Sequence, residues 1–319
     1  MAGLFVLANI IALVLAAPAR AFGYQALPNP QDPLNPLIYI VLVLAFTGVI
    51  LLVIRKRRES FVKYLILGAM AITMVYVYSL PLTYLLLYLQ DPALLTGPVS
   101  PSQAELALNL GLLAFGLSIV VSAFLTYLLV KRPEWYVVDL VGVSTAAGVT
   151  AIMGISFGIL PAFLLLIALA VYDAIAVYRT KHMVALADAV TAQRLPVLLV
   201  VPKKRGYSFL KQEGLQKQID AGEEREAMFM GLGDIIIPGI LVVSAFTFLP
   251  AAPLAGIPRS LLVGVGALLG ALVGYLILLR YLTEGKPQAG LPLLNGGAMA
   301  GYAVAYILLF GNASLGLVG

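Results

Sequence analysis

Two aspartates lie inside apolar stretches of the chain that are long enough to cross a membrane. Asp173 belongs to the run SFGILPAFLLLIALAVYDAIAVY, and Asp234 belongs to MFMGLGDIIIPGILVVSAFTFL. A carboxylate in hydrocarbon costs on the order of 3 kcal/mol or more, so an acid in such a place indicates a function. Two neighbouring carboxyl groups can hydrolyse an amide, because the ionised one deprotonates water while the protonated one donates to the carbonyl oxygen. We expect Asp173 and Asp234 to form such a catalytic pair and to share one proton.

The two aspartates are expected at similar depths below the same face of the bilayer. Asp173 precedes Arg179 by six residues, and Asp234 follows Arg225 by nine. At about 1.5 Å per helical residue, both carboxyl groups fall roughly 9–14 Å from that face. The predicted pair therefore has a short route to water.

The composition is that of a polytopic membrane protein. The chain of 319 residues is 61% hydrophobic and 11% charged, and its mean hydropathy is +1.01. Apolar runs long enough to cross a hydrocarbon core of about 30 Å recur throughout, and backbone groups in lipid must pair within helices or closed barrels. We predict an all-α fold with nine transmembrane helices, near residues 3–17, 37–54, 61–88, 104–130, 136–153, 155–178, 228–249, 258–280 and 291–311.

The basic residues predict the orientation. All of the 20 Lys and Arg except Arg20 and Arg259 fall in every second gap between the predicted spans. The positive-inside rule then places the N-terminus and the 179–227 loop in the cytoplasm and the C-terminus outside. This loop divides the chain into an N-terminal block of six spans (1–178) and a C-terminal block of three (228–319). Because the charge follows topology, it does not indicate nucleic-acid binding.

Other features exclude several kinds of site. The chain has no cysteine and one histidine, His182, so we expect no metal site and no cofactor. The 179–227 loop begins as an expected amphipathic helix, and LPVLLVVP within it is a short β-like run. The first predicted helix ends in Ala19-Arg20-Ala21, which a signal peptidase could cut, but it lacks a basic segment before its apolar core. We therefore favour a retained first helix.

The motifs around the aspartates resemble those of a known family. Tyr172-Asp173 gives a YD pair on one helix, and Gly231-Leu232-Gly233-Asp234 gives a G-x-G-D on the next, after the loop. These motifs are similar to those of the presenilin and signal peptide peptidase family of intramembrane aspartyl proteases, and the cytoplasmic loop is similar to that of presenilins. The resemblance implies nine helices, with the aspartates on the sixth and seventh. It also implies single-span or signal-peptide-like substrates that are cleaved within the lipid bilayer.

The family's P-A-L-P motif at the ninth helix is changed in this chain. Its place is taken by Ala289-Gly290-Leu291-Pro292, which keeps the leucine and the second proline. The resemblance implies that an unwound substrate segment pairs with this irregular backbone near Gly290–Leu291, a form of strand addition. We expect these four residues to contact substrate.

Tyr172 and Gly231-Leu232-Gly233 are the remaining residues expected at the substrate site. The missing side chains of the two glycines let another backbone approach the carboxylate of Asp234 closely. Tyr172 lies about 100° around its helix from Asp173, so we expect it to line the substrate channel.

Two other functions remain open at this point. Asp139, a third aspartate in an apolar stretch, could join the pair in a proton- or cation-coupled transporter. Asp139 follows Trp135 near the expected interface, however, and we favour a structural or snorkelling role for it. Prepilin peptidases also carry a G-x-G-D, but their first aspartate is not in a mid-helix YD pair.

Overall fold

The computed structural model describes residues 1–55, 59–95, 100–180, 198–203, 227–283 and 288–317. Its α-helices are α1 (Ala2–Ala21), α2 (Asn35–Arg55), α3 (Glu59–Gln90), α4 (Pro101–Lys131), α5 (Trp135–Ser156), α6 (Ile159–Ile175), α9 (Gly233–Phe248), α10 (Arg259–Thr283) and α11 (Leu291–Phe310). A 3-10 turn, Pro92–Leu95, follows α3, and a π-helical turn, Ala176–Thr180, continues α6. The helices of the described residues thus correspond one by one to the predicted spans. The predicted all-α membrane fold is confirmed.

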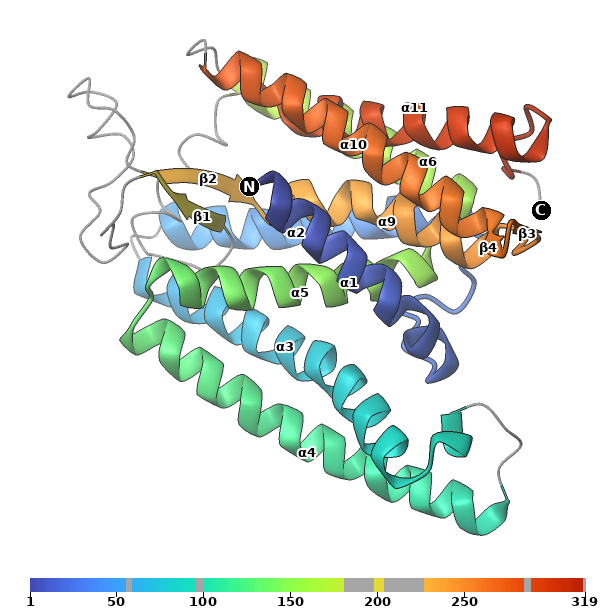
Figure 1. Ribbon diagram of the computed structural model, residues 1–319. Coiled ribbons are helices and arrows are strands. Elements are labelled where there is room, and N and C mark those ends of the chain that lie inside the picture. The colour runs from blue at the N-terminus through green and yellow to red at the C-terminus, as the bar shows by residue number, and fades with distance from the viewer. Residues whose placement is uncertain (56–58, 96–99, 181–197, 204–226, 284–287, 318–319) are drawn as a thin grey trace.

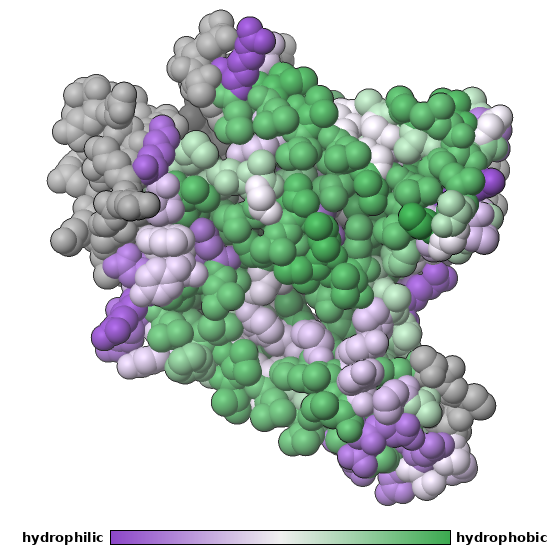
Figure 2. Space-filling view, in the orientation of Figure 1, coloured by the Kyte–Doolittle hydropathy of each residue, from purple (hydrophilic) through white to green (hydrophobic). Residues whose placement is uncertain are grey.

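The chain crosses the bundle repeatedly from end to end. The N-terminus lies beside strand β2 (Ala227–Gly231) at one end, and the described chain finishes at the other end, near the hairpin of β3 (Pro253–Leu254) and β4 (Ile257–Pro258) (Figure 1). Within the described residues, α1, α3, α4, α5, α6, α10 and α11 have the length and apolarity of a membrane span. Apolar side chains also cover most of the visible surface along the helices (Figure 2). The protein is therefore an integral membrane protein.

The prediction of a helical span over 228–249 is wrong at its start. Residues Ala227–Gly231 form strand β2, and α9 begins only at Gly233. The partner of β2 is β1 (Leu198–Pro202), within the LPVLLVVP run for which a β-like structure was predicted. The strands are antiparallel, with Leu198 opposite Gly231. The predicted amphipathic helix that begins the loop and His182 both lie outside the described residues.

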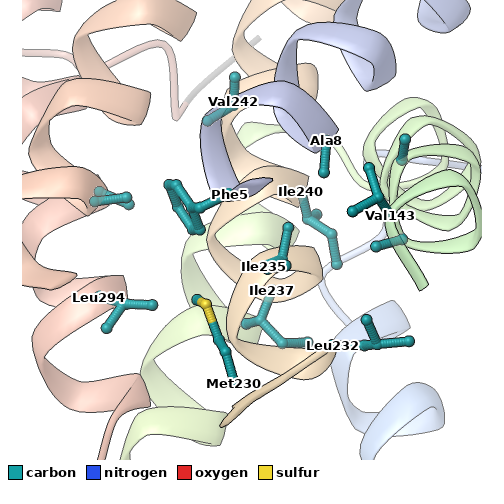
Figure 3. Packing of buried hydrophobic residues seen from close by; sticks show 14 of the residues in the cluster. Phe5, Ala8, Val143, Met230, Leu232, Ile235, Ile237, Ile240, Val242 and Leu294 are labelled. Carbon is teal, nitrogen blue, oxygen red and sulfur yellow. The ribbon is translucent and has the colours of Figure 1, made fainter. Parts of the chain in front are cut away.

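Helix α9 is the centre of the packed core. It contacts α1, α5, α6, α10 and α11, and its residues Ile235 and Ile240 are fully buried among side chains of those helices (Figure 3). Phe5 and Ala8 of α1 belong to the same core and are also fully buried, so the N-terminal helix is part of the fold. A helix that is apolar on every side is stable only inside such a bundle.

Helices α10 and α11 touch through their backbones. A Cβ atom added at Gly270 would lie only 2.1 Å from the carbonyl oxygen of Gly297, and one added at Gly274 would lie 2.1 Å from that of Leu293. Small residues at a helix interface allow this close approach, as is common in membranes. The contact fixes the start of α11 against α10.

The two basic residues outside the predicted cytoplasmic gaps both lie at the end of the bundle away from β2. Arg20, in the last turn of α1, donates to the carbonyl oxygen of Thr247 at 3.0 Å and lies over the ring of Phe248. Arg259 begins α10, and its guanidinium lies over the ring of Phe310. Both cations are therefore held locally by the ends of neighbouring helices.

Candidate active site

Asp234 lies in the first turn of α9, which a turn at Leu232 connects to the end of strand β2 at Gly231. The predicted position inside a helical span is thus replaced by a helix N-terminus. The side chain is half-buried, and its Oδ2 lies 3.5 Å from the position that a Cβ of Gly231 would take. Gly233 is exposed and has nothing within 4 Å of its Cβ position. Of the two glycines, Gly231 is therefore the one that lies against the carboxylate.

Strand β1 is held on α5 by Asp139. Its Oδ1 accepts a hydrogen bond from the backbone N–H of Val200 at 2.7 Å, and the side chain is 8% exposed. A buried carboxylate that binds a strand in this way has a structural role, as expected, and does not snorkel to the interface. Because β1 pairs with β2, this bond also fixes the strand that leads into Asp234.

Leu232 packs the turn before Asp234 against α5. Its side chain is 9% exposed, and its Cδ2 lies 3.3 Å from the Cβ position of Gly142 on α5. The absence of a side chain at Gly142 also makes room for Leu199 of β1. Leu232 was expected to contact substrate, but its buried position instead seats the turn before Asp234 on α5.

Asp173 lies near the end of α6 and faces the start of α11. It is 6% exposed, and its Oδ2 accepts a hydrogen bond from the backbone N–H of Leu291 at 3.0 Å. The N–H of Gly290 also bonds to this carboxylate. Tyr178, on the π-helical turn after α6, accepts from the N–H of Ala289 at 3.4 Å. Three successive backbone N–H groups are thus bound by side chains from one short stretch, 173–178.

Both aspartates meet at Gly290. The Oδ1 of Asp234 lies 3.6 Å from the position that a Cβ of Gly290 would take, and the N–H of Gly290 bonds to Asp173. The two carboxyl groups are close enough to interact electrostatically. The structure therefore brings the end of α6 and the beginnings of α9 and α11 together around two carboxyl groups.

A cavity of about 500 Å³ opens beside Asp234. Its walls come from β2, α10 and the segment before α11, including Met228, Met230, Tyr275, Leu278 and Gly290. The lining is mostly apolar, and flexible methionine side chains adapt to differently shaped partners. This space has room for side chains of a peptide that approaches Asp234.

The other residues predicted at the site occupy its edges. Tyr172 is half-buried next to Asp173, Ala289 is buried, and Leu291 and Pro292 are half-buried at the first turn of α11. In the described parts of the chain, no three His, Cys, Asp or Glu side chains gather closely enough to hold a metal ion.

Tyr178 was not found from the sequence. An α-helix would turn it about 140° away from Asp173, whereas a π-helical turn, with its i→i+5 hydrogen bonds, changes that direction. The family resemblance indicated only that residues 289–292 lie close to the aspartates. It did not indicate that Tyr178 binds them.

A model of the signal-peptide peptidase and presenilin aspartyl protease family matches residues 2–96 and 104–311. The chain belongs to this family. It is an intramembrane aspartyl protease, and the membrane transporter considered from the sequence has no support from this match. A comparison with curated proteins gave no significant match.

Solved structures agree with this assignment. A presenilin family intramembrane aspartate protease crystallised in space group C222 is similar to this chain, with 35% sequence identity and a TM-score of 0.63. The similarity covers 97% of this chain and 98% of that one. The structure of such a protease in space group P2 is also similar, with 35% identity, a TM-score of 0.62 and coverage of 97% and 96% of the two chains.

Proposed function

We propose that Asp173 and Asp234 are the catalytic pair of this protease and that it cleaves single-span or signal-peptide-like substrates within their membrane segments. The observation that carries the proposal is the meeting of both carboxyl groups at Gly290, at the edge of a cavity. Two carboxyl groups this close hold one proton between them, since two neighbouring negative charges repel. The pair then contains one base and one acid, as amide hydrolysis requires.

The reaction proceeds by addition of water to the scissile carbonyl. The ionised carboxylate takes one proton from water while the oxygen of that water bonds to the carbonyl carbon. The protonated carboxyl group donates its proton to the carbonyl oxygen. The tetrahedral diol then collapses as its C–N bond breaks. The proton taken from water passes to the leaving nitrogen, and one hydroxyl proton of the diol returns to the pair. The pair ends with the single proton that it held at the start.

The substrate is extended where it is cut. The amide of an intact helix is occupied by its own hydrogen bonds and enclosed by side chains, so the segment must unwind before a carboxyl group can reach it. The cavity runs along β2 to Gly290, a shape that suits an extended peptide lying beside the backbone of 227–231. Met230, Gly231 and Gly290, which line the cavity, then contact the peptide.

We further propose that the site faces the cytoplasm. Arg55, Lys63 and Lys131 lie at the bundle end that also holds β1 and β2, and the basic residues of a membrane protein favour the cytoplasmic side. The N-terminus and the 179–227 loop are then cytoplasmic, and the C-terminus is outside. Cysteine labelling from each side of sealed vesicles tests this orientation.

Cleavage by purified variants tests the catalytic pair. Asp173→Asn and Asp234→Asn are each expected to abolish cleavage of a single-span substrate in detergent, while thermal unfolding of the protein is preserved. Asp139→Asn is the matched control, because it changes a buried aspartate of the membrane region but keeps an oxygen that accepts from Val200. Residual cleavage above a few per cent in either catalytic variant would remove that residue from the pair.

A transition-state analogue of aspartyl proteases provides an independent test. It should block cleavage by the unchanged protein and bind to it more tightly than to Asp234→Asn. Equal binding to both proteins would show that the analogue does not occupy the proposed site.

A further inference from the structure

Helix α11 carries one polar side chain deep in its contact with α6. Asn295 is fully buried in the apolar sequence LPLLNGGAMAG, and its Nδ2 donates to the carbonyl oxygen of Leu166 at 2.9 Å. A polar residue in this environment is stable only when its hydrogen bonds are made within the protein. The bond therefore links the two helices at one defined point.

This link lies in line with the candidate active site. Asn295 follows Leu291 by one turn of α11, and Leu166 precedes Asp173 by two turns of α6. Residues four or seven positions apart lie on the same face of a helix, so both bonds belong to one α6–α11 contact. In the described part of the chain, hydrogen bonds thus join α6 and the start of α11 at two levels, from Gly290 and Leu291 to Asp173 and from Asn295 to Leu166.

The apolar contacts of α11 do not determine its position along α6. The rings of Phe163 and Tyr302 pack edge to face at 5.2 Å, but apolar contacts are non-directional and tolerate sliding. The backbone contact at Gly297 locates α11 against α10 and not against α6. The directed bond from Asn295 to the carbonyl oxygen of Leu166 supplies a restraint that does not depend on the Asp173 carboxylate.

Asn295 is a poor source of stability. Its Oδ1 is buried and has no hydrogen-bond partner among the residues that the structure describes. A buried, unpaired carbonyl costs more than an average hydrogen bond between membrane helices returns. The Asn295 amide therefore adds little to the free energy of unfolding, and its role is better explained by the position that it gives α11 along α6.

We propose that Asn295 is a positioning residue for the protease, an inference that rests on the proposed catalytic use of Asp173. By fixing α11 along α6, Asn295 holds the N–H groups of Gly290 and Leu291 against the Asp173 carboxylate. It thereby orients that carboxylate toward Asp234 and the scissile amide. A displacement of about 1 Å at a reacting group can reduce the rate as much as 100-fold.

The test compares rate and stability in Asn295→Leu, which keeps the number and branching of the side-chain heavy atoms but has no polar atoms. We expect kcat for a single-span substrate to fall about 10- to 100-fold, with KM within about twofold of that of the unchanged protein because Asn295 does not line the cavity. The Tm in detergent should be unchanged or higher, because the unpaired oxygen is removed. A role in stability alone predicts the opposite, a lower Tm with unchanged kcat per folded molecule.

A second variant separates the amide from packing. Asn295→Ala also removes the bond but leaves a cavity, so its Tm should be lower than that of Asn295→Leu while the loss of kcat is similar. Ser122→Ala is the matched control, since Ser122 of α4 donates to the carbonyl oxygen of Ala71 on α3 at 2.7 Å, outside the site. This control should leave kcat unchanged.

The outcomes distinguish this inference from the proposed function. Unchanged kcat in Asn295→Leu, or a kcat loss in the two Asn295 variants that follows their Tm, overturns the positioning role while leaving the catalytic pair intact. Cleavage by Asp173→Asn overturns the proposed function itself. If Asn295→Leu does not fold, the kcat of Asn295→Ala decides the question.

Discussion

Replacement of Gly297 by alanine is expected to push α11 away from α10, whereas the same change at the neighbouring Gly296 should leave the helices in contact. A Cβ at Gly297 would lie 2.2 Å from the carbonyl oxygen of Gly270, and ordinary contact begins at 3.4 Å. The helix backbones must therefore separate by about 1.2 Å, the difference between these distances. A Cβ at Gly296 meets nothing within 4 Å.

The two variants together isolate the packing cost. Both gain about 1 kcal/mol of helix propensity when glycine becomes alanine. Only Gly297→Ala also overpacks an interface, at a cost of about 1–3 kcal/mol. The free energy of unfolding of Gly297→Ala should therefore be about 1–3 kcal/mol below that of Gly296→Ala.

The same displacement should reach the active site. Gly297 lies less than two turns from Leu291, whose N–H binds Asp173, so a shift of α11 moves this donor. We expect Gly297→Ala to cleave at least tenfold more slowly than Gly296→Ala, on the scale of loss that misplacement by about 1 Å produces. The assay is thermal unfolding in detergent together with initial rates on a single-span substrate. Equal stability and equal rates in the two variants would refute the backbone-contact argument.

Further outcomes follow from the site and its supports. Gly290→Ala should retain cleavage, because the added Cβ makes ordinary contacts, 3.4 Å to Leu278 and 3.6 Å to Asp234. Gly290→Val should reduce the rate more than about tenfold, since the extra carbons of valine crowd the carboxylate. Equal rates in the two variants would remove Gly290 from the site. Asp139→Leu leaves the N–H of Val200 unpaired and should lower the free energy of unfolding by about 1–3 kcal/mol relative to Asp139→Asn, as chemical or thermal denaturation can measure. The pH–rate profile should be bell-shaped, because only the singly protonated pair is active. A rate that rises or falls monotonically over the pH range in which the protein stays folded would contradict proton sharing. Mass spectrometry of the products should locate the cut in the cytoplasmic half of the substrate's span; a cut in the outer half would contradict the proposed orientation.

Most of the helices could be predicted because each apolar run is long enough to cross the membrane, and length alone distinguishes such runs from strands. The start of α9 is the instructive exception. Residues 227–231 are as apolar as the helix that follows, so the pattern could not separate them. The strand forms because Leu198–Pro202, distant in sequence, supplies its hydrogen-bonding partner.

Some residues of the candidate site could likewise be predicted from the sequence, and others could not. Asp173 and Asp234 stand out because acids are rare in apolar segments, and the segment 289–292 was indicated by the family resemblance. Tyr178 and Asn295 were missed because their roles depend on a π-helical turn and on how α6 and α11 align. Periodicity along a single helix contains no information about either.

The bond from Asp139 to Val200 insulates the active site from the length of the polypeptide between β1 and β2. One end of that connection is fastened to α5 through β1, and the other enters β2 and then α9. A change of length between these anchors therefore acts on strands that α5 and α9 already hold, and it reaches Asp234 only through them.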